Sequence, residues 1–183
     1  LMFNKKVLSE QFIITHEVSN LLKIDKQNLI KNAVTNYAFN NRLSNEDWYP
    51  DYNYIDLSDH QHLAWIHDYI RDHYRAEYGN TPILVKRGAI VLKKNESIGS
   101  HHHINDWDYN NSPEISAIYC LTGDEKKSSV IFEYEFGRNK KLRWRENLKE
   151  NKLILFPSYL KHFIPKNISD EAMVALSFQF QLL

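Results

Sequence analysis

The chain after Pro82 is a series of short apolar runs, and this series restricts the fold more than any other feature. The runs are rich in β-branched and aromatic residues and are separated by Gly, Asn, Pro and charged residues. This pattern is typical of the strands and turns of a β-sandwich or small barrel. In residues 130–136 the apolar side chains alternate with Glu133 and Glu135, as in a half-buried strand. The predicted strands are residues 83–92, 115–121, 130–136, 153–156 and 173–180.

The first third of the chain has a different character. Residues 11–18 alternate as in a strand, and residues 25–39 carry apolar side chains at the spacing of an amphipathic helix. Residues 40–54 are rich in Asn, Asp and aromatics, which predicts a long loop that could cover a substrate. Ser58 and Gln61 form a capping-box pattern for a second helix, and Gly79 ends it. Its histidines spread around the helix and are expected to be surface or partly packed residues: His60, His62, His67 and His73.

Helices followed by a block of strands predict an α+β or mainly β fold. We expect one domain over residues 1–183, with a β-barrel or sandwich core at residues 82–183. Residues 1–81 form an N-terminal elaboration whose two helices pack against the outside of the barrel. A length of 183 residues allows a sizeable core.

Charge and cysteine content exclude several functions. Lys plus Arg equals Asp plus Glu, 23 each, so no net charge attracts nucleic acid or an acidic membrane. The local basic run at residues 138–145 is interpreted as a solvated hairpin edge. Cys120 is the single cysteine, which fits a cytoplasmic protein without internal disulfides. The sequence predicts neither a signal peptide nor a membrane span.

Clustered histidines indicate a metal site. Residues 99–108 read Gly-Ser-His-His-His-Ile-Asn-Asp-Trp-Asp, and His162 follows a strand-like run and a Phe-Pro-Ser turn. Two ligands from one strand end and a third from a distant strand suit a metal in the mouth of a β-barrel. Imidazole and carboxylate donors favour Fe(II) and leave coordination positions open for substrate and dioxygen.

The C-terminal half, roughly residues 82–183, resembles the Fe(II)- and 2-oxoglutarate-dependent oxygenases. The resemblance is closest to a small group of bacterial and phage proteins within that superfamily. It implies a double-stranded β-helix, also called a jelly roll, with Fe(II) and 2-oxoglutarate as cofactors and ascorbate as an auxiliary reductant. It also implies hydroxylation of a small molecule or a peptide side chain. The matching segments are the histidine cluster and residues 115–121, 153–165 and 175–179.

Two ligand sets remain open. Residues i and i+2 of a strand face the same way, so His101 and His103 share a face and His102 points away. The superfamily places a carboxylate two residues after its first histidine, but Asn105 follows His103 at that distance. The metal is therefore held either by His101, His103 and His162, or by His103, Asp106 and His162 after a local bulge.

The resemblance also implies residues for the cosubstrate and the substrate. An arginine on the last strand normally pairs with the distal carboxylate of 2-oxoglutarate, but Met173 occupies this position here. The candidate replacements are Lys161, Lys166, Lys93 and Arg87, and the spacing singles out none of them. Tyr119 either donates its hydroxyl to the cosubstrate or fills the core. Trp107 and Tyr109 either contact substrate or pack the loop.

Two other classes remain as alternatives. Cupins share the barrel and bind metal without 2-oxoglutarate, and His101, His103, Glu114, Gly123 and His162 follow a loose version of their pattern. The second alternative is a non-catalytic jelly-roll domain that binds a sugar or a partner and whose histidines are incidental.

Overall fold

The computed structural model describes residues 11–18, 24–43, 54–55, 61–105, 107–135 and 140–183 of the chain. These residues form two long helices and ten strands. In chain order the elements are β1 (Ile14–Glu17), α1 (Lys26–Leu43), β2 (Tyr54–Ile55), α2 (Gln61–Tyr78), β3 (Pro82–Leu92), β4 (Ile98–His101), the 3-10 helix η2 (Tyr109–Asn111), β5 (Ile115–Thr122), β6 (Ser129–Glu135), β7 (Lys141–Asn147), β8 (Lys152–Pro157), β9 (Lys161–Ile164) and β10 (Met173–Leu182).

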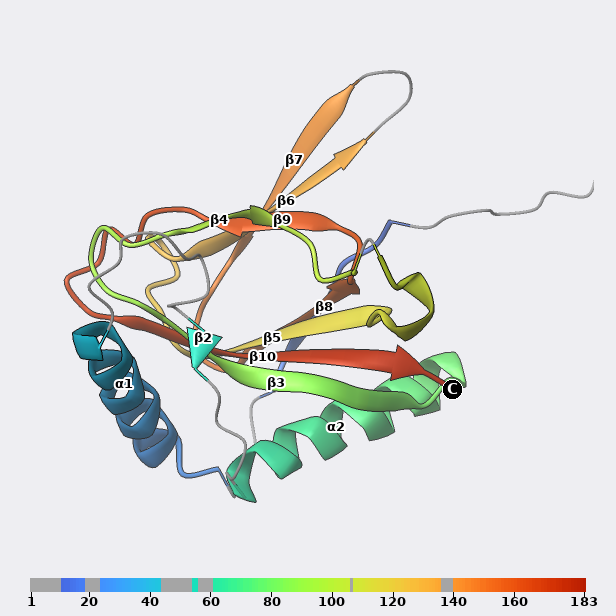
Figure 1. The fold of residues 1–183 in the computed structure, drawn as a ribbon, viewed down its shortest axis with the longest axis horizontal. Coiled ribbons are helices and arrows are strands. Elements are labelled where there is room, and N and C mark those ends of the chain that lie inside the picture. The colour runs from blue at the N-terminus through green and yellow to red at the C-terminus, as the bar shows by residue number, and fades with distance from the viewer. Residues whose placement is uncertain (1–10, 19–23, 44–53, 56–60, 106, 136–139) are drawn as a thin grey trace, which may run out of the picture.

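The strands form two antiparallel sheets in a layered arrangement. The larger sheet has the order β1-β8-β5-β10-β3-β2, and the smaller sheet has the order β4-β9-β6-β7. Figure 1 shows the smaller sheet above the larger one and both helices below the larger one, with the β6–β7 hairpin projecting outward. The described chain is therefore mainly β, with helices on one outer face, as the sequence predicts.

One apolar core fills the space between the sheets. Phe132 of β6 and Phe156 of β8 are fully buried in it, and their rings meet edge to face at 5.0 Å. Val130 is also buried and Glu135 is exposed, whereas Glu133 and Tyr134 are both half-buried. The predicted alternation is therefore confirmed at Val130, Phe132 and Glu135, and Phe136 lies outside the described residues. Each large side chain buried in this way stabilises the contact between the sheets by about 1.5–3 kcal/mol.

A second core joins the helices to the outer face of the larger sheet. The α2 side chains Leu63, Ile66 and Ile70 are at most 2% exposed and lie against this face. Their spacing of three and four residues gives the helix one apolar stripe. Gly79 ends α2 with φ of 83°, a left-handed conformation that glycine adopts without steric cost. The expected helical cover of the sheet is confirmed.

The five strand predictions after Pro82 are confirmed, but three strands were not predicted. β4, β7 and β9 are short or carry mostly polar side chains, so they lack the apolar runs on which the prediction depended. β7 contains the basic run from Lys141 onward, is mostly exposed and lies at the edge of the smaller sheet. The interpretation of this run as a solvated hairpin edge is confirmed there, and Arg138 lies outside the described residues.

The N-terminal third differs from expectation in two respects. α1 continues to Leu43, so the predicted loop cannot begin at residue 40. β2, at one edge of the larger sheet, lies at the end of the predicted loop, whereas β1, at the other edge, confirms the strand predicted within residues 11–18. The lid expected around Trp48, Tyr49 and Tyr52 and the capping box at Ser58 lie outside the described residues.

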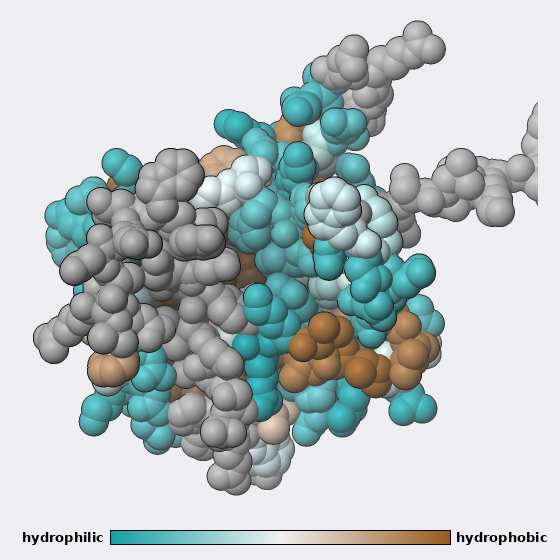
Figure 2. All heavy atoms as spheres, viewed as in Figure 1, coloured by the Kyte–Doolittle hydropathy of each residue, from teal (hydrophilic) through white to brown (hydrophobic). Residues whose placement is uncertain are grey.

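The outer surface is mostly hydrophilic on the face drawn in Figure 2, apart from an apolar patch near the C-terminal end. Ile83, Val85 and Leu183 are exposed apolar residues in that region. Among the described residues, neither long helix is apolar enough to cross a membrane.

Gly123, just after β5, lies where a side chain would meet other atoms. A Cβ at this position would lie 2.9 Å from the Leu148 carbonyl oxygen and 3.1 Å from Cys120 Sγ. Because the first of these is backbone, Gly123→Ala is expected to destabilise the fold by about 1–3 kcal/mol. Chemical denaturation measures this change. Gly99→Ala is the control, since nothing lies within 4 Å of its added methyl group, and equal midpoints for the two variants would contradict the prediction.

Candidate metal centre

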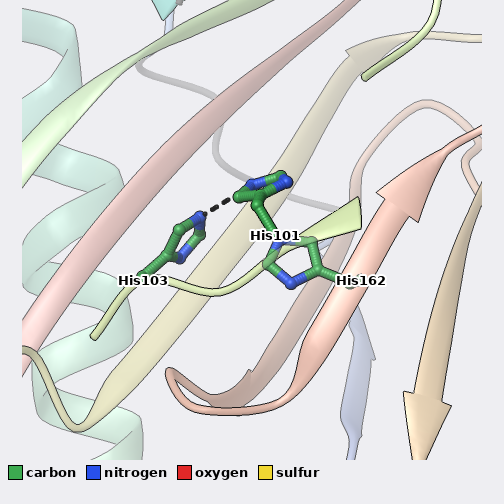
Figure 3. Close-up of side chains that lie close together, drawn as sticks. All are labelled: His101, His103 and His162. Carbon is green, nitrogen blue, oxygen red and sulfur yellow. Dashed lines mark hydrogen bonds between the residues drawn. The ribbon is translucent and has the colours of Figure 1, made fainter. Parts of the chain in front are cut away.

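Three histidines converge at one point, two from neighbouring strands of the smaller sheet and one from the segment that follows the first strand. One ring nitrogen from each of His101, His103 and His162 lies within 4.8 Å of the other two. Figure 3 shows the three rings turned toward one another, with His162 on β9 and His101 at the end of β4. His101 pairs with His162 across the two strands, and a register shift between Ile98 and His101 turns the latter side chain inward.

His103 reaches the cluster from outside regular strand geometry. β4 ends at His101, and the backbone amide of His103 donates a hydrogen bond of 2.8 Å to the Ser158 carbonyl. This bond fixes the chain beside the turn that follows β8. The cluster therefore depends on two segments about sixty residues apart in sequence, as the sequence predicts.

The second nitrogen of each ring is held by another group. His101 Nδ1 donates to the Gly99 carbonyl at 2.8 Å, and His162 Nδ1 donates to the Leu160 carbonyl at 3.0 Å. His103 Nδ1 lies 2.7 Å from Ser116 Oγ, which in turn lies 2.7 Å from Ser158 Oγ. Such outer partners fix the ring orientation and the tautomer of metal-binding histidines, leaving Nε2 as the ligand atom.

The Nε2 atoms of His101 and His103 face each other at 3.3 Å. When both rings carry their proton on Nδ1, two lone pairs oppose each other at this distance. A shared cation relieves this repulsion, and metal–nitrogen bonds of about 2.1 Å at right angles place two ligand atoms about 3 Å apart. The donor set and its geometry therefore fit a divalent transition metal.

The electrostatics of the site keep the imidazoles of His103 and His162 neutral. Burial, followed by the nearby His162, His101 and Lys86, lowers the pKa of His103 to about 2. Burial, followed by His101, lowers the pKa of His162 to about 3. Neutral imidazole is the form that binds metal, so the protein presents these two rings ready for a metal ion near neutral pH.

A cavity of about 360 Å³ opens beside the histidines. Ile90, Ile118 and Ile164 give it apolar walls, while Lys86, Ser177 and Gln179 line another part of it. This volume lies within the range of small-molecule sites, about 300–1,000 Å³. An ion bound by the histidines would lie next to a space that a small molecule can enter.

The structure brings together one of the two ligand sets predicted from sequence. His101, His103 and His162 meet, whereas Asp106 lies outside the described residues. His102 contributes no nitrogen to the cluster, but it borders the cavity instead of pointing away from it. Strict alternation fails there because the strand ends one residue earlier.

Of the two roles left open for Tyr119, the structure supports that of a core residue and contradicts that of a cosubstrate contact. Its side chain is fully buried in the core between the helices and the larger sheet, and its hydroxyl donates to Asn151 Oδ1 at 3.1 Å. Burial raises the pKa of Tyr119 to about 12. On β5 the residues that face the histidines are Ser116 and Ile118, so Tyr119 points to the opposite face of the sheet.

The replacement cations predicted from sequence also lie elsewhere. Lys161 borders a different pocket beside Glu133 and does not line the histidine cavity, because it is one residue from His162 on β9. Lys93 lies over the Tyr37 ring of α1, 4.8 Å from its centre. Arg87 and Lys166 do not line the cavity either. Met173 is buried between the sheets, so this position does not bind an anion.

The remaining site expectations concern aromatic residues and helix histidines. Trp107 and Tyr109 are 96% and 65% exposed on the loop after the cavity residues Ile104 and Asn105, and neither lines the cavity. Their contact with substrate stays a prediction.

On α2, His67 stacks on Phe180 with a distance of 5.9 Å between the ring centres, and His73 hydrogen-bonds to the Tyr69 carbonyl. Both are packing or surface residues, as expected.

Sequence reasoning missed the polar residues that face the histidines from the larger sheet. Ser116 lies within a buried and mostly apolar strand. A serine in such a strand is the one feature of the sequence that could have indicated a polar contact there. Lys86 and Gln179 are paired directly across β3 and β10. Their inward orientation follows the same alternation as Ile90 and Ser177, so the pairing of the two strands would have identified them.

Comparisons with known proteins agree on the fold. No family model matches the sequence, and no curated protein matches it. The structure is similar to the α-ketoglutarate-dependent carbocyclase SnoK from nogalamycin biosynthesis, with a TM-score of 0.64 and 10% identity over 93% of this chain and 80% of that one. It is also similar to a Pseudomonas putida prolyl-4-hydroxylase, with a TM-score of 0.59 and 11% identity over 92% and 91% of the chains.

A third similar structure is HygX from Streptomyces hygroscopicus, solved with nickel and 2-oxoglutarate bound. Its TM-score is 0.60, with 11% identity over 92% of this chain and 81% of that one. The described chain therefore shares its mainly antiparallel fold with these three proteins. At these identities the likeness concerns the fold alone, and the histidine cluster is the feature from which an activity can be inferred.

Proposed function

We propose that the chain is an Fe(II)- and 2-oxoglutarate-dependent oxygenase. The observation that carries this proposal is the convergence of His101, His103 and His162, with their Nε2 atoms turned inward, beside a cavity of small-molecule size. The similar structures favour an oxygenase over a cupin or a non-catalytic binding domain, since one is α-ketoglutarate-dependent and another binds nickel and 2-oxoglutarate.

The strand order supports a double-stranded β-helix. β3 to β10 supply four strands to each of two facing sheets, in the orders β8-β5-β10-β3 and β4-β9-β6-β7. In such a barrel the metal lies at the open end between the sheets. We take residues 82–183 as the jelly-roll core and residues 1–81 as its elaboration within one domain.

The residues of the site have separate roles in this proposal. His101, His103 and His162 would hold Fe(II), with Asp106 as the alternative to His101. Bound Fe(II) with 2-oxoglutarate supplies oxidation by dioxygen, coupled to conversion of the cosubstrate into succinate and carbon dioxide. Ser116 and Ser158 orient His103, and the apolar walls formed by Ile90, Ile118 and Ile164 exclude water from the reacting groups.

The substrate is a small molecule or a peptide side chain, and hydroxylation is the proposed outcome. The fold also accommodates a carbocyclase and a prolyl-4-hydroxylase, so the same site chemistry can end in different products. Equal numbers of basic and acidic residues argue against a nucleic-acid substrate. Trp107 and Tyr109 are the proposed substrate contacts on the adjacent loop. The cytoplasmic location expected from the single cysteine stays a prediction.

Succinate release tests the proposal directly. The Fe(II)-loaded protein, given 2-oxoglutarate and ascorbate under air, is expected to form succinate even without its substrate, though slowly. The His162→Gln variant is the matched control because it lacks the ligand atom while keeping a side chain of similar length. Succinate formation should fall to the rate of free Fe(II) in that variant.

A thermal-shift measurement distinguishes a slow enzyme from a wrong proposal. With Mn(II) in place of Fe(II), 2-oxoglutarate is expected to raise the melting temperature, because a ligand that binds only the folded state stabilises it. If the wild-type chain binds metal but neither forms succinate nor responds to 2-oxoglutarate, the oxygenase proposal is wrong.

A further inference from the structure

The cavity beside the histidines has two chemically different ends. At one end are the imidazoles of the proposed metal centre. Lys86, on β3, lines the same cavity together with Gln179, which is its direct partner on β10. Ser177 lies two residues before Gln179 on β10 and lines the cavity as well. The wall supplied by the larger sheet therefore includes a polar group formed by one amine, one amide and one hydroxyl.

The orientation of this group follows from the strand pairing. Ser177 pairs with Gly88, and Ala175 pairs with Ile90, so Lys86 continues the series of residues that face the smaller sheet. Residues on the opposite face, such as Ala89 and Phe178, are buried against the helices. Lys86 itself is exposed, so its amine can meet a ligand that enters from solvent.

The charge of the cavity is one-sided. Among the described residues that line it, Lys86 is accompanied by four histidines and one glutamine, and by no Asp or Glu. Three neutral imidazoles would leave the double positive charge of a bound metal without compensation from the protein. An anionic ligand is favoured electrostatically in such a cavity.

The deeper space between the sheets does not offer another place for an anion. Leu92, Val130 and Met173 are at most 2% exposed in the apolar core there. A charged group placed among them would be buried without a partner, which is strongly unfavourable. Within the described residues, the wall containing Lys86 is therefore where a carboxylate can be bound.

We propose that Lys86, with Gln179 beside it, binds a carboxylate group of the small molecule that occupies the cavity. This inference rests on the proposed function, because the histidines must hold the metal at the other end. The carboxylate belongs either to the 2-oxo acid, at the end distant from the metal, or to the substrate. Both sources present the same chemistry to the lysine, an anion that accepts a charge-assisted hydrogen bond.

Titration calorimetry on the Mn(II)-loaded protein separates these sources. The probes are 2-oxoglutarate, 2-oxopentanoate, which has the same chain length but lacks the distal carboxylate, and succinate added to protein saturated with 2-oxoglutarate. The variant is Lys86→Met, which removes the charge and keeps the length. Lys161→Met is the matched control, because Lys161 lies outside the cavity on the strand that carries His162.

If Lys86 binds the cosubstrate, the Lys86→Met substitution lowers the affinity for 2-oxoglutarate by about 10- to 100-fold and leaves the affinity for 2-oxopentanoate unchanged. If it binds the substrate, both 2-oxo acids bind normally and the binding of added succinate is lost. The inference is overturned if Lys86→Met binds all three probes with the affinity of the wild type, or loses the same affinity for both 2-oxo acids. It is also overturned if the affinities of Lys86→Met differ little from those of Lys161→Met.

Failure of this inference is distinguishable from failure of the proposed function. A wild-type protein that binds Mn(II) but no 2-oxo acid would remove the oxygenase proposal. Succinate alone would then be titrated into the Mn(II)-loaded wild type and Lys86→Met proteins. A loss of succinate binding confined to Lys86→Met supports the carboxylate site, and equal binding by both proteins overturns it.

Discussion

Replacing His162 by alanine is expected to abolish the binding of one divalent metal ion per chain. His162 is 2% exposed, and its Nδ1 is bound to the Leu160 carbonyl, so its Nε2 is fixed toward His101 and His103. Loss of a group that only orients a metal ligand weakens metal binding by about 10- to 100-fold. Loss of the ligand itself should therefore weaken it by more than about 100-fold, measured by competition with a chelator of known affinity.

Two further variants make this prediction specific. His102→Ala removes the neighbouring imidazole, which borders the cavity but contributes no nitrogen to the cluster. Its effect on metal affinity should be small. His101→Ala distinguishes the ligand sets, because it weakens binding strongly only when His101 rather than Asp106 completes the site. Equal losses in His102→Ala and His162→Ala would contradict the assignment, provided that all variants show a cooperative unfolding transition.

The convergence of the histidines could be predicted from sequence because both segments carry local signals. The cluster at residues 101–103 and the turn before His162 each lie at the end of a strand, and a barrel brings such ends together. The manner of convergence could not be predicted. It depends on the register shift before His101 and on the hydrogen bond from the His103 amide to the Ser158 carbonyl. Neither feature can be recognised from the amino-acid types at these positions.

The sequence alone does not determine which face of the sheet each residue of a fully buried strand occupies. β5 is buried on both sides, with Ile118 between the two sheets and Tyr119 between the larger sheet and the helices. A strand buried on both faces reads as a continuous apolar run, so its two faces cannot be told apart by alternation. The error for Tyr119 has this cause. The error for Lys161 has another, since β9 was not predicted as a strand.

Acid is expected to destabilise the metal-free protein well above the pH at which carboxylates titrate. The pKa of His103 is lowered to about 2 and that of His162 to about 3, in both cases mainly by burial. In the unfolded chain both side chains return to an ordinary pKa of about 6.5. Above that pH, both imidazoles are neutral in the folded and the unfolded state, so the pKa shifts contribute nothing to the pH dependence of the free energy of unfolding. Below it the unfolded state takes up protons that the folded state does not, so the free energy of unfolding decreases.

The expected decrease between pH 7.5 and 5.5 is about 1.4 kcal/mol for each of these histidines, or about 3 kcal/mol for both. Urea denaturation of chelator-treated protein at a series of pH values measures it. The His162→Leu variant should lose about half of this pH dependence, because one of the two shifted groups is gone. His73→Leu is the matched control, since that ring lies exposed on α2. A free energy of unfolding that stays constant over this range, or a slope unchanged in His162→Leu, would show that the two rings are protonated in the folded protein. The imidazoles would then repel a metal cation near pH 6 instead of binding it.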